Sequence, residues 1–126
     1  MILDSSSMKP IYIQISEWLE TEILAQNFLP EDKVYSQYQL AEMYNINPAT
    51  AAKGLTVLVD EEVLYKKRGL GMFVSSNARS IIQMKRKNQT LSTLVKEIVK
   101  EAAHLNVSNK ELISMIQEEM KAGDSK

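Results

Sequence analysis

The sequence predicts a mainly α-helical protein with one small β-hairpin, in which a helical domain closed by the hairpin is followed by a two-helix segment. Three observations predict this fold class. Apolar residues recur at helical spacing in several stretches, two short β-prone runs flank a glycine-containing loop, and a further helical apolar stripe occupies residues 77–126. At 126 residues, the chain suits one compact domain with a small appendage.

The composition excludes several classes of protein. The chain has no cysteine, which excludes disulfides, thiolate metal sites and cysteine nucleophiles and suits a reducing compartment. No run approaches the roughly 18 to 20 apolar residues that cross a bilayer, and the start lacks the pattern of a signal peptide. A net charge of −1 argues against coating nucleic acid by bulk electrostatics. We therefore expect a cytoplasmic protein, outside the membrane, whose contacts with any polyanion are local.

A first helix is expected from Pro10 to about Gln26, because proline suits the first helical turn. Its inner face is expected to consist of Ile11, Ile15, Trp18, Leu19, Glu22 and Ile23. The residues that follow break the helix, and residues 33–35 form a short extended piece at most.

Two short helices with capping signals come next. Ser36 and Gln39 have the spacing of a capping box and open a helix over residues 36–44. Asn47, followed by a proline, is a start signal for a helix over residues 49–61. Two helices joined by so short a turn are typical of a helix-turn-helix. The inner face of the second is expected to carry Ala52, Leu55, Leu58 and Val59.

A β-hairpin is expected after the third helix. Residues 63–66 and 72–74 are β-prone, and the loop between them, residues 67–71, contains two glycines. Three helices closed by a hairpin form a winged helix-turn-helix domain, which we place at residues 9–76.

The segment over residues 77–126 is expected to be helical, and Ser108 and Glu111 have the spacing of a second capping box that opens the last helix. Two amphipathic helices cannot bury their apolar faces alone, so they need the first domain or another chain. We interpret the segment as a dimerisation segment. Its expected interface residues are Ile81, Ile82, Leu91, Leu94, Val95, Ile98, Ala102, Leu112, Ile113, Ile116 and Met120.

Four motifs together resemble a known family. Residues 10–15, 40–41, 47–55 and 64–74 are similar, in order and spacing, to the DNA-binding domain of GntR-type bacterial repressors, and the resemblance spans residues 9–76. The Asn-Pro-Ala-Thr sequence and the short helical tail resemble the YtrA branch. The resemblance implies a homodimeric transcriptional regulator, a repressor of a pseudo-palindromic operator on double-stranded DNA, with control of a transporter operon as the usual setting.

Residues for DNA contact are expected in three places. The start of the second helix of a helix-turn-helix meets base edges in the major groove, and its free N–H groups face phosphates. In the hairpin, three cations beside two glycines allow the backbone to approach a phosphate or the minor groove. The start of the preceding helix is the third place. The expected contact residues are Ser36, Gln37, Tyr38, Asn47, Pro48, Ala49, Thr50, Lys53, Lys66, Lys67, Arg68, Gly69 and Gly71.

Other interpretations of these residues stay open. Asn47 and Pro48 can serve only to start a helix, and Lys53 can be a solvated surface lysine. Gln37, Tyr38 and Gln39 can be surface and capping residues alone. Where many relatives carry arginine, this sequence has Tyr38, Pro48 and Ala52, so base readout is expected to differ. Glu62 stands where a glycine commonly ends the recognition helix, which implies a different helix end or backbone strain.

Catalysis is not expected. His104 is the sole histidine, and it has no second imidazole or thiol with which to hold a metal. No phosphate loop, metalloprotease motif or nucleophile–base pair is visible, and we expect no cofactor and no enzyme activity. A winged-helix adaptor that binds protein without base readout is the alternative function. Neither an operator sequence nor a small-molecule effector can be deduced from the sequence.

Overall fold

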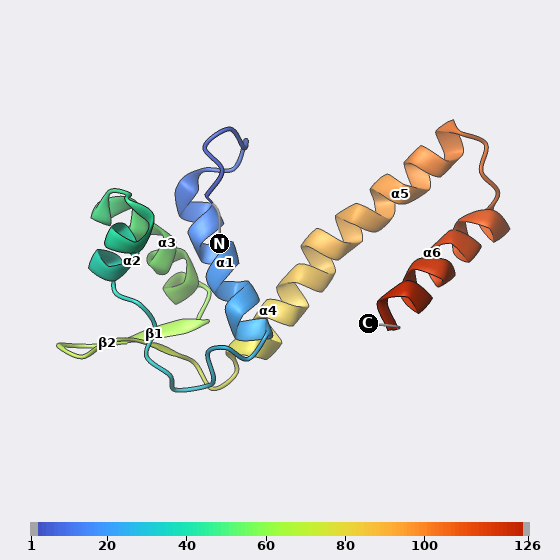
Figure 1. The fold of residues 1–126 in the computed structure, drawn as a ribbon. Helices are drawn as coiled ribbons and strands as arrows, with labels where there is room; N and C mark the ends of the chain where they lie inside the picture. Colours follow the sequence, from blue (N-terminus) through green and yellow to red (C-terminus); the bar gives the residue numbers. More distant parts are fainter. Residues whose placement is uncertain (1–2, 125–126) are drawn as a thin grey trace. The chain divides into compact units, whose positions relative to one another are not determined.

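The computed structural model describes residues 3–124. It is mainly helical with one antiparallel two-stranded hairpin, which confirms the predicted fold class. The chain divides into two compact units, Met1–Lys85 and Arg86–Lys126 (Figure 1). The boundary lies beyond the expected one at residue 76, because the helix α4 (Ala78–Arg86) contributes Ala78 and Ile82 to the core of the first unit.

Three helices form the body of the first unit: α1 (Ile11–Leu24), α2 (Gln37–Tyr44) and α3 (Pro48–Asp60). The helices α1 and α3 approach closely at Gly54, where an added Cβ would lie 2.8 Å from the carbonyl oxygen of Tyr12. The core cluster, which draws on every element of the unit, consists of Ile15, Leu19, Ile23, Val34, Leu40, Ala51, Leu55, Leu58, Val63, Leu64, Val74, Ala78 and Ile82.

The predicted inner faces of two helices need correction. In α1 the buried acid is Glu20, whereas Glu22 is only half-buried. In α3 the buried alanine is Ala51, and Ala52 is only half-buried, because the close approach of α1 rotates the buried face toward Gly54.

The predicted caps of α2 and α3 are confirmed. The Ser36 hydroxyl accepts a hydrogen bond from the Gln39 backbone N–H at 3.1 Å, and the Gln39 side chain accepts one from the Ser36 N–H at 2.8 Å. At the start of α3, the Asn47 side chain accepts a hydrogen bond from the Ala49 N–H at 2.8 Å, and Pro48 occupies the first turn. Both helices of the helix-turn-helix therefore begin at the residues that the sequence indicates.

The hairpin consists of β1 (Leu64–Lys67) and β2 (Gly71–Val74), with Tyr65 opposite Phe73 and Lys67 opposite Gly71. The expected extended piece pairs with the free edge of β2: Lys33 forms a β-bridge with Phe73, and the Val34 N–H donates to the Met72 carbonyl at 2.9 Å. This third strand segment joins the hairpin to the chain before α2.

The second unit contains a π-helical turn, η1 (Lys87–Leu91), and two helices, α5 (Ser92–His104) and α6 (Asn109–Asp124). The Ser108 hydroxyl accepts from the Glu111 N–H at 3.1 Å, so the expected cap of the last helix is present. The helix α6 runs back along α5 as a helical hairpin, seen in orange and red in Figure 1.

Three of the expected interface residues lie elsewhere. Ile82 is 0% exposed in the core of the first unit, and Ile81 packs against the same core. Ala102 is 8% exposed within its own hairpin, where its carbonyl accepts from the Val107 N–H at 2.9 Å. Because a side chain buried within one unit is not available to a second copy, we no longer expect Ile82 and Ala102 in an interface, and Ile81 has little surface left to offer. The other interface residues stay a prediction.

Candidate nucleic-acid interface

The start of α3 is an exposed surface of the first unit. Asn47, Pro48 and Ala49 are exposed, and Thr50 is half-buried. The Asn47 oxygen is engaged by the Ala49 N–H, so the capping role of Asn47 is real. The side-chain amide nitrogen of Asn47 and the Thr50 hydroxyl are the polar groups that this end can offer to base edges or phosphates.

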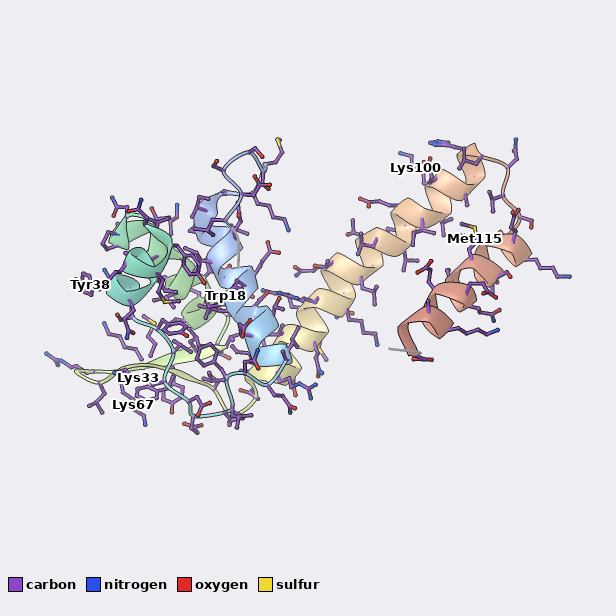
Figure 2. All side chains as sticks on the ribbon, in the orientation of Figure 1. Trp18, Lys33, Tyr38, Lys67, Lys100 and Met115 are labelled. Atoms are coloured by element: carbon purple, nitrogen blue, oxygen red, sulfur yellow. The ribbon has the colours of Figure 1, made fainter. Side chains whose placement is uncertain are left out.

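The start of α2 presents Tyr38, whose side chain is 69% exposed and projects outward in Figure 2. The Ser36 hydroxyl serves the capping box, and Gln37 is half-buried. Of these three expected contacts, the Tyr38 hydroxyl is therefore the one that can reach furthest toward a phosphate.

Lys53 is not simply a solvated lysine. Its ammonium nitrogen lies 4.2 Å from the centre of the Tyr12 ring, which belongs to α1. A cation above an aromatic face is held by the quadrupole of the ring, so the position of the Lys53 charge on the exposed face of α3 is defined by the fold.

The two glycines of the hairpin have different environments. Gly69 has φ +78°, and a Cβ added there would meet nothing within 4 Å. Gly71 has φ +120°, and a Cβ there would lie 2.8 Å from Cε of Lys33. Gly69 therefore leaves open space at the tip, beside the exposed Arg68 and Leu70, whereas Gly71 is covered by a side chain of this protein.

The cations of the hairpin have no acidic partner in the first unit. Within residues 3–124, no carboxylate lies within ion-pair distance of Lys66, Lys67 or Arg68. The ammonium of Lys67 instead lies 4.5 Å from the centre of the Phe73 ring. The hairpin is thus a local concentration of uncompensated positive charge on a chain of net charge −1.

Sequence reasoning does not place Lys33 on this surface. Its bridge to Phe73 places it on the face of the hairpin that carries Tyr65 and Lys67, since cross-strand partners share a face. The predicted extended piece was the only available signal, and it does not identify the strand with which the piece pairs.

Comparisons with known proteins agree with this geometry. No family model matches the sequence. The chain is 37% identical over 75 residues to the transcriptional repressor NagR of Bacillus subtilis, a match that covers 60% of this chain and 31% of NagR, so the chain spans about a third of that relative. It is 28% identical over 116 residues to the repressor YtrA of Bacillus subtilis, covering 92% of this chain and 88% of YtrA.

Solved structures also match nearly the full length of the chain. A GntR-family regulator from Listeria monocytogenes has a TM-score of 0.74 at 29% identity and covers 91% of this chain and 97% of its own. A Bacteroides thetaiotaomicron protein assigned to the GntR family has a TM-score of 0.76 at 31% identity, with 90% and 99% covered. The chain belongs to the GntR family of transcriptional regulators. Within it, the match to YtrA over nearly the full length places the chain in the YtrA subfamily.

A further similar structure contains DNA. The DNA-binding domain of AraR in complex with an operator has a TM-score of 0.54 at 27% identity and covers 60% of this chain. The chain is accordingly a DNA-binding transcriptional regulator and not an enzyme. Which of its own residues touch DNA remains a prediction.

The recognition helix of this GntR protein ends on a non-glycine residue in the left-handed region. Glu62 has φ +63°, and the Val63 N–H donates to the Leu58 carbonyl at 2.9 Å, which is the bond of a Schellman motif. The helix end is therefore the usual one, although glutamate replaces glycine there. Of the two expectations for Glu62, a different helix end or backbone strain, backbone strain is confirmed.

Behind the recognition helix lies a charge cluster that the sequence did not indicate. Glu20 of α1 is 1% exposed and forms an ion pair with Lys85 of α4, whose ammonium also lies 2.7 Å from the carboxylate of Glu61, the residue after α3. Burial alone would lower the pKa of Lys85, but the hydrogen bonds from its ammonium to the two carboxylates outweigh burial and raise this pKa above its ordinary value. The cluster ties the end of the recognition helix to α1 and α4.

Other site types find no support in the described part of the chain. Across residues 3–124, no group of three or more His, Asp or Glu side chains is placed to hold a metal ion. His104 is exposed, with Nδ1 3.6 Å from the Glu101 carboxylate. No helix among these residues is long and apolar enough to cross a membrane.

Proposed function

We propose that this chain is a homodimeric repressor that acts in the cytoplasm by occupying a pseudo-palindromic operator. The observation that carries the proposal is that one chain combines two exposed surfaces. The first unit exposes the start of the recognition helix and a hairpin of unpaired cations, and the second unit exposes most of its large apolar side chains. Gene control by a DNA-occupying dimer needs both parts.

The apolar surface of the second unit supports the dimer. Its hairpin leaves an open groove of about 480 Å³ between α5 and α6, lined mainly by Ile98, Leu112, Met115, Ile116 and Met120. Further large apolar side chains are exposed in or next to these helices, namely Leu91, Leu94, Val95, Val99, Leu105 and Ile113. Contiguous apolar surface of this kind marks an interaction site, and a second copy offers the same surface in return, as two-fold symmetry requires.

A two-fold dimer presents two recognition helices to two major grooves about one helical turn apart, so the half-sites should be inverted. Repression follows if the operator overlaps a promoter, and the relatives NagR and YtrA are both described as repressors. Control of a transporter operon stays a prediction from the YtrA resemblance.

Footprinting on genomic fragments selected by the protein tests the proposal, together with light scattering of the free protein. We expect a dimer and a protected site with two inverted halves. Arg68→Ala should weaken binding to all sequences by a similar factor, on the order of 1 kcal/mol, because a contact to phosphate carries little base information.

A monomer in solution, a single unrepeated half-site or equal affinity for every sequence would contradict the proposal. The absence of any footprint alongside capture of a protein partner would favour the winged-helix adaptor instead.

A further inference from the structure

We propose that Lys33, a residue outside both the helix-turn-helix and the hairpin loop, is a fourth cation of the DNA-binding wing, and that Gly71 provides the space over which its side chain reaches the hairpin tip. This inference rests on the DNA-binding function. It adds a residue that binds the phosphate backbone, and it changes the role expected of one glycine.

The pairing of strands places Lys33 on the wing. Phe73, in the central strand β2, pairs with Lys33 on one side and with Tyr65 of β1 on the other. The three side chains therefore form one row on one face of the sheet. The next row toward the tip is Lys67 opposite Gly71. Figure 2 shows Lys33 and Lys67 together beside the hairpin.

The side chains of Lys33 and Lys67 run in opposite directions along this face. The ammonium of Lys67 points back over the Phe73 ring at 4.5 Å from its centre. The Lys33 chain points forward over Gly71: the position of a Cβ at Gly71 lies 2.8 Å from Cε and 3.6 Å from Nζ of Lys33. Any side chain at position 71 would occupy the place of the lysine chain, so the missing Cβ is what lets the Lys33 charge sit near the tip.

The charge of Lys33 is uncompensated where it lies. Lys33 is exposed, and no carboxylate among residues 3–124 is within ion-pair distance of it. The carboxylate of Glu31 accepts a hydrogen bond from the Tyr65 hydroxyl. Lys33 thus adds a fourth cation to Lys66, Lys67 and Arg68 on the wing, and it lies on the face that carries Lys67. The partner that this concentration of positive charge fits is a phosphate backbone.

Gly69 and Gly71 therefore have different roles in the hairpin. At Gly69 a Cβ would meet open space, which suits close approach of the backbone to DNA. Gly71 is covered by Lys33 and is not free for such an approach. The expectation that both glycines contact DNA is therefore replaced, for Gly71, by a positioning role that acts through Lys33.

The first experiment compares Lys33→Met with Lys110→Met in the full-length protein. Methionine keeps a flexible apolar chain over Gly71 but removes the charge, and Lys110 is an exposed lysine of α6 outside every proposed contact. The probe is a labelled mixed-sequence duplex, and its affinity is measured by fluorescence anisotropy over a range of salt concentrations. Lys33→Met should weaken binding several-fold at low salt. It should reduce the log-log salt slope by about 0.9 per subunit in contact with the duplex, which is about 1.8 for a dimer, and Lys110→Met should leave the slope unchanged.

The second experiment is a double-mutant cycle between Lys33→Ala and Gly71→Ala, with circular dichroism as a check on folding. Gly71→Ala alone should displace the lysine and weaken duplex binding. In the Lys33→Ala background the new methyl group meets no lysine, so the added loss should be smaller.

The outcomes separate this inference from the function on which it rests. If the wild-type protein shows no salt-dependent binding to the duplex, the DNA-binding proposal itself fails. If wild type binds and Lys33→Met retains its full salt slope, Lys33 is not a DNA contact. Strict additivity of the two alanine substitutions would overturn the role of Gly71 in placing Lys33.

Discussion

The two units of this chain differ in how far their apolar side chains are buried. In the first, all three helices, the hairpin and α4 contribute to one closed core cluster, which lies entirely before Lys85. In the second, Ala102 is the sole buried apolar residue among those described, and most of the large apolar side chains of α5 and α6 are exposed. We therefore expect the first unit to fold alone and the second to need a partner, so DNA contact and dimer formation should be separable by mutation.

The largest expected effect comes from truncation within α4. A chain ending after Lys85 should fold and remain monomeric, because it keeps the whole core cluster. A chain ending after Val74 loses Ala78 and Ile82 from the core and loses the ion pair between Lys85 and Glu20. Together these losses should lower the free energy of unfolding by about 5 kcal/mol or more. Urea denaturation of both fragments, followed by circular dichroism, checks this. Equal stability of the two fragments would contradict the placement of α4 in the first unit.

A smaller loss should follow from Lys85→Met. Removing the ammonium leaves the buried Glu20 carboxylate without this partner, which should cost about 3 kcal/mol at neutral pH. The raised pKa of Lys85 fixes the pH dependence: its stabilisation is fully present below the ordinary lysine pKa of 10.5 and is lost as the pH rises through the higher folded value.

The wild-type protein and Lys85→Met should therefore converge in unfolding free energy at strongly alkaline pH. Lys100→Met, a change at an exposed lysine of α5, is the matched control and should leave stability unchanged. A constant difference between wild type and Lys85→Met from neutral to alkaline pH would show that the lysine acts by packing alone.

The double substitution Leu94→Asp and Ile98→Asp should disrupt the dimer surface of the second unit. Both side chains are exposed on α5, so the first unit should keep its circular dichroism and thermal midpoint while the dimer dissociates. Operator affinity should fall roughly 100-fold, about 2.7 kcal/mol, because the two half-sites are then bound independently. Light scattering and footprinting measure the two effects. A double variant that stays dimeric would move the interface away from this face.

How far the sequence predicts the molecule depends on the range of each interaction. The caps at Ser36 and Asn47 and the hairpin were predicted correctly because their signals lie within a few residues. Glu20 and Lys85 were missed because they are 65 residues apart and meet only after folding. Lys33 was missed for the same reason, since its partner strand is distant in sequence. Ile82 was misplaced because an apolar face does not say which surface covers it.

The smallest expected effect is a gain in stability, and it is confined to the first unit. Glu62 holds φ +63° at the end of the recognition helix, a conformation that costs a residue with a Cβ roughly 1 kcal/mol. Glu62→Gly should therefore raise the free energy of unfolding by about 0.5 to 1 kcal/mol, less than the full strain because glycine also gains freedom in the unfolded chain. Glu62→Ala is the matched control: it removes the same charge but keeps the Cβ, so it should give no gain. Urea midpoints of the fragment ending after Lys85 measure the difference without interference from the second unit, and an equal gain for both variants would assign the effect to charge rather than to backbone strain.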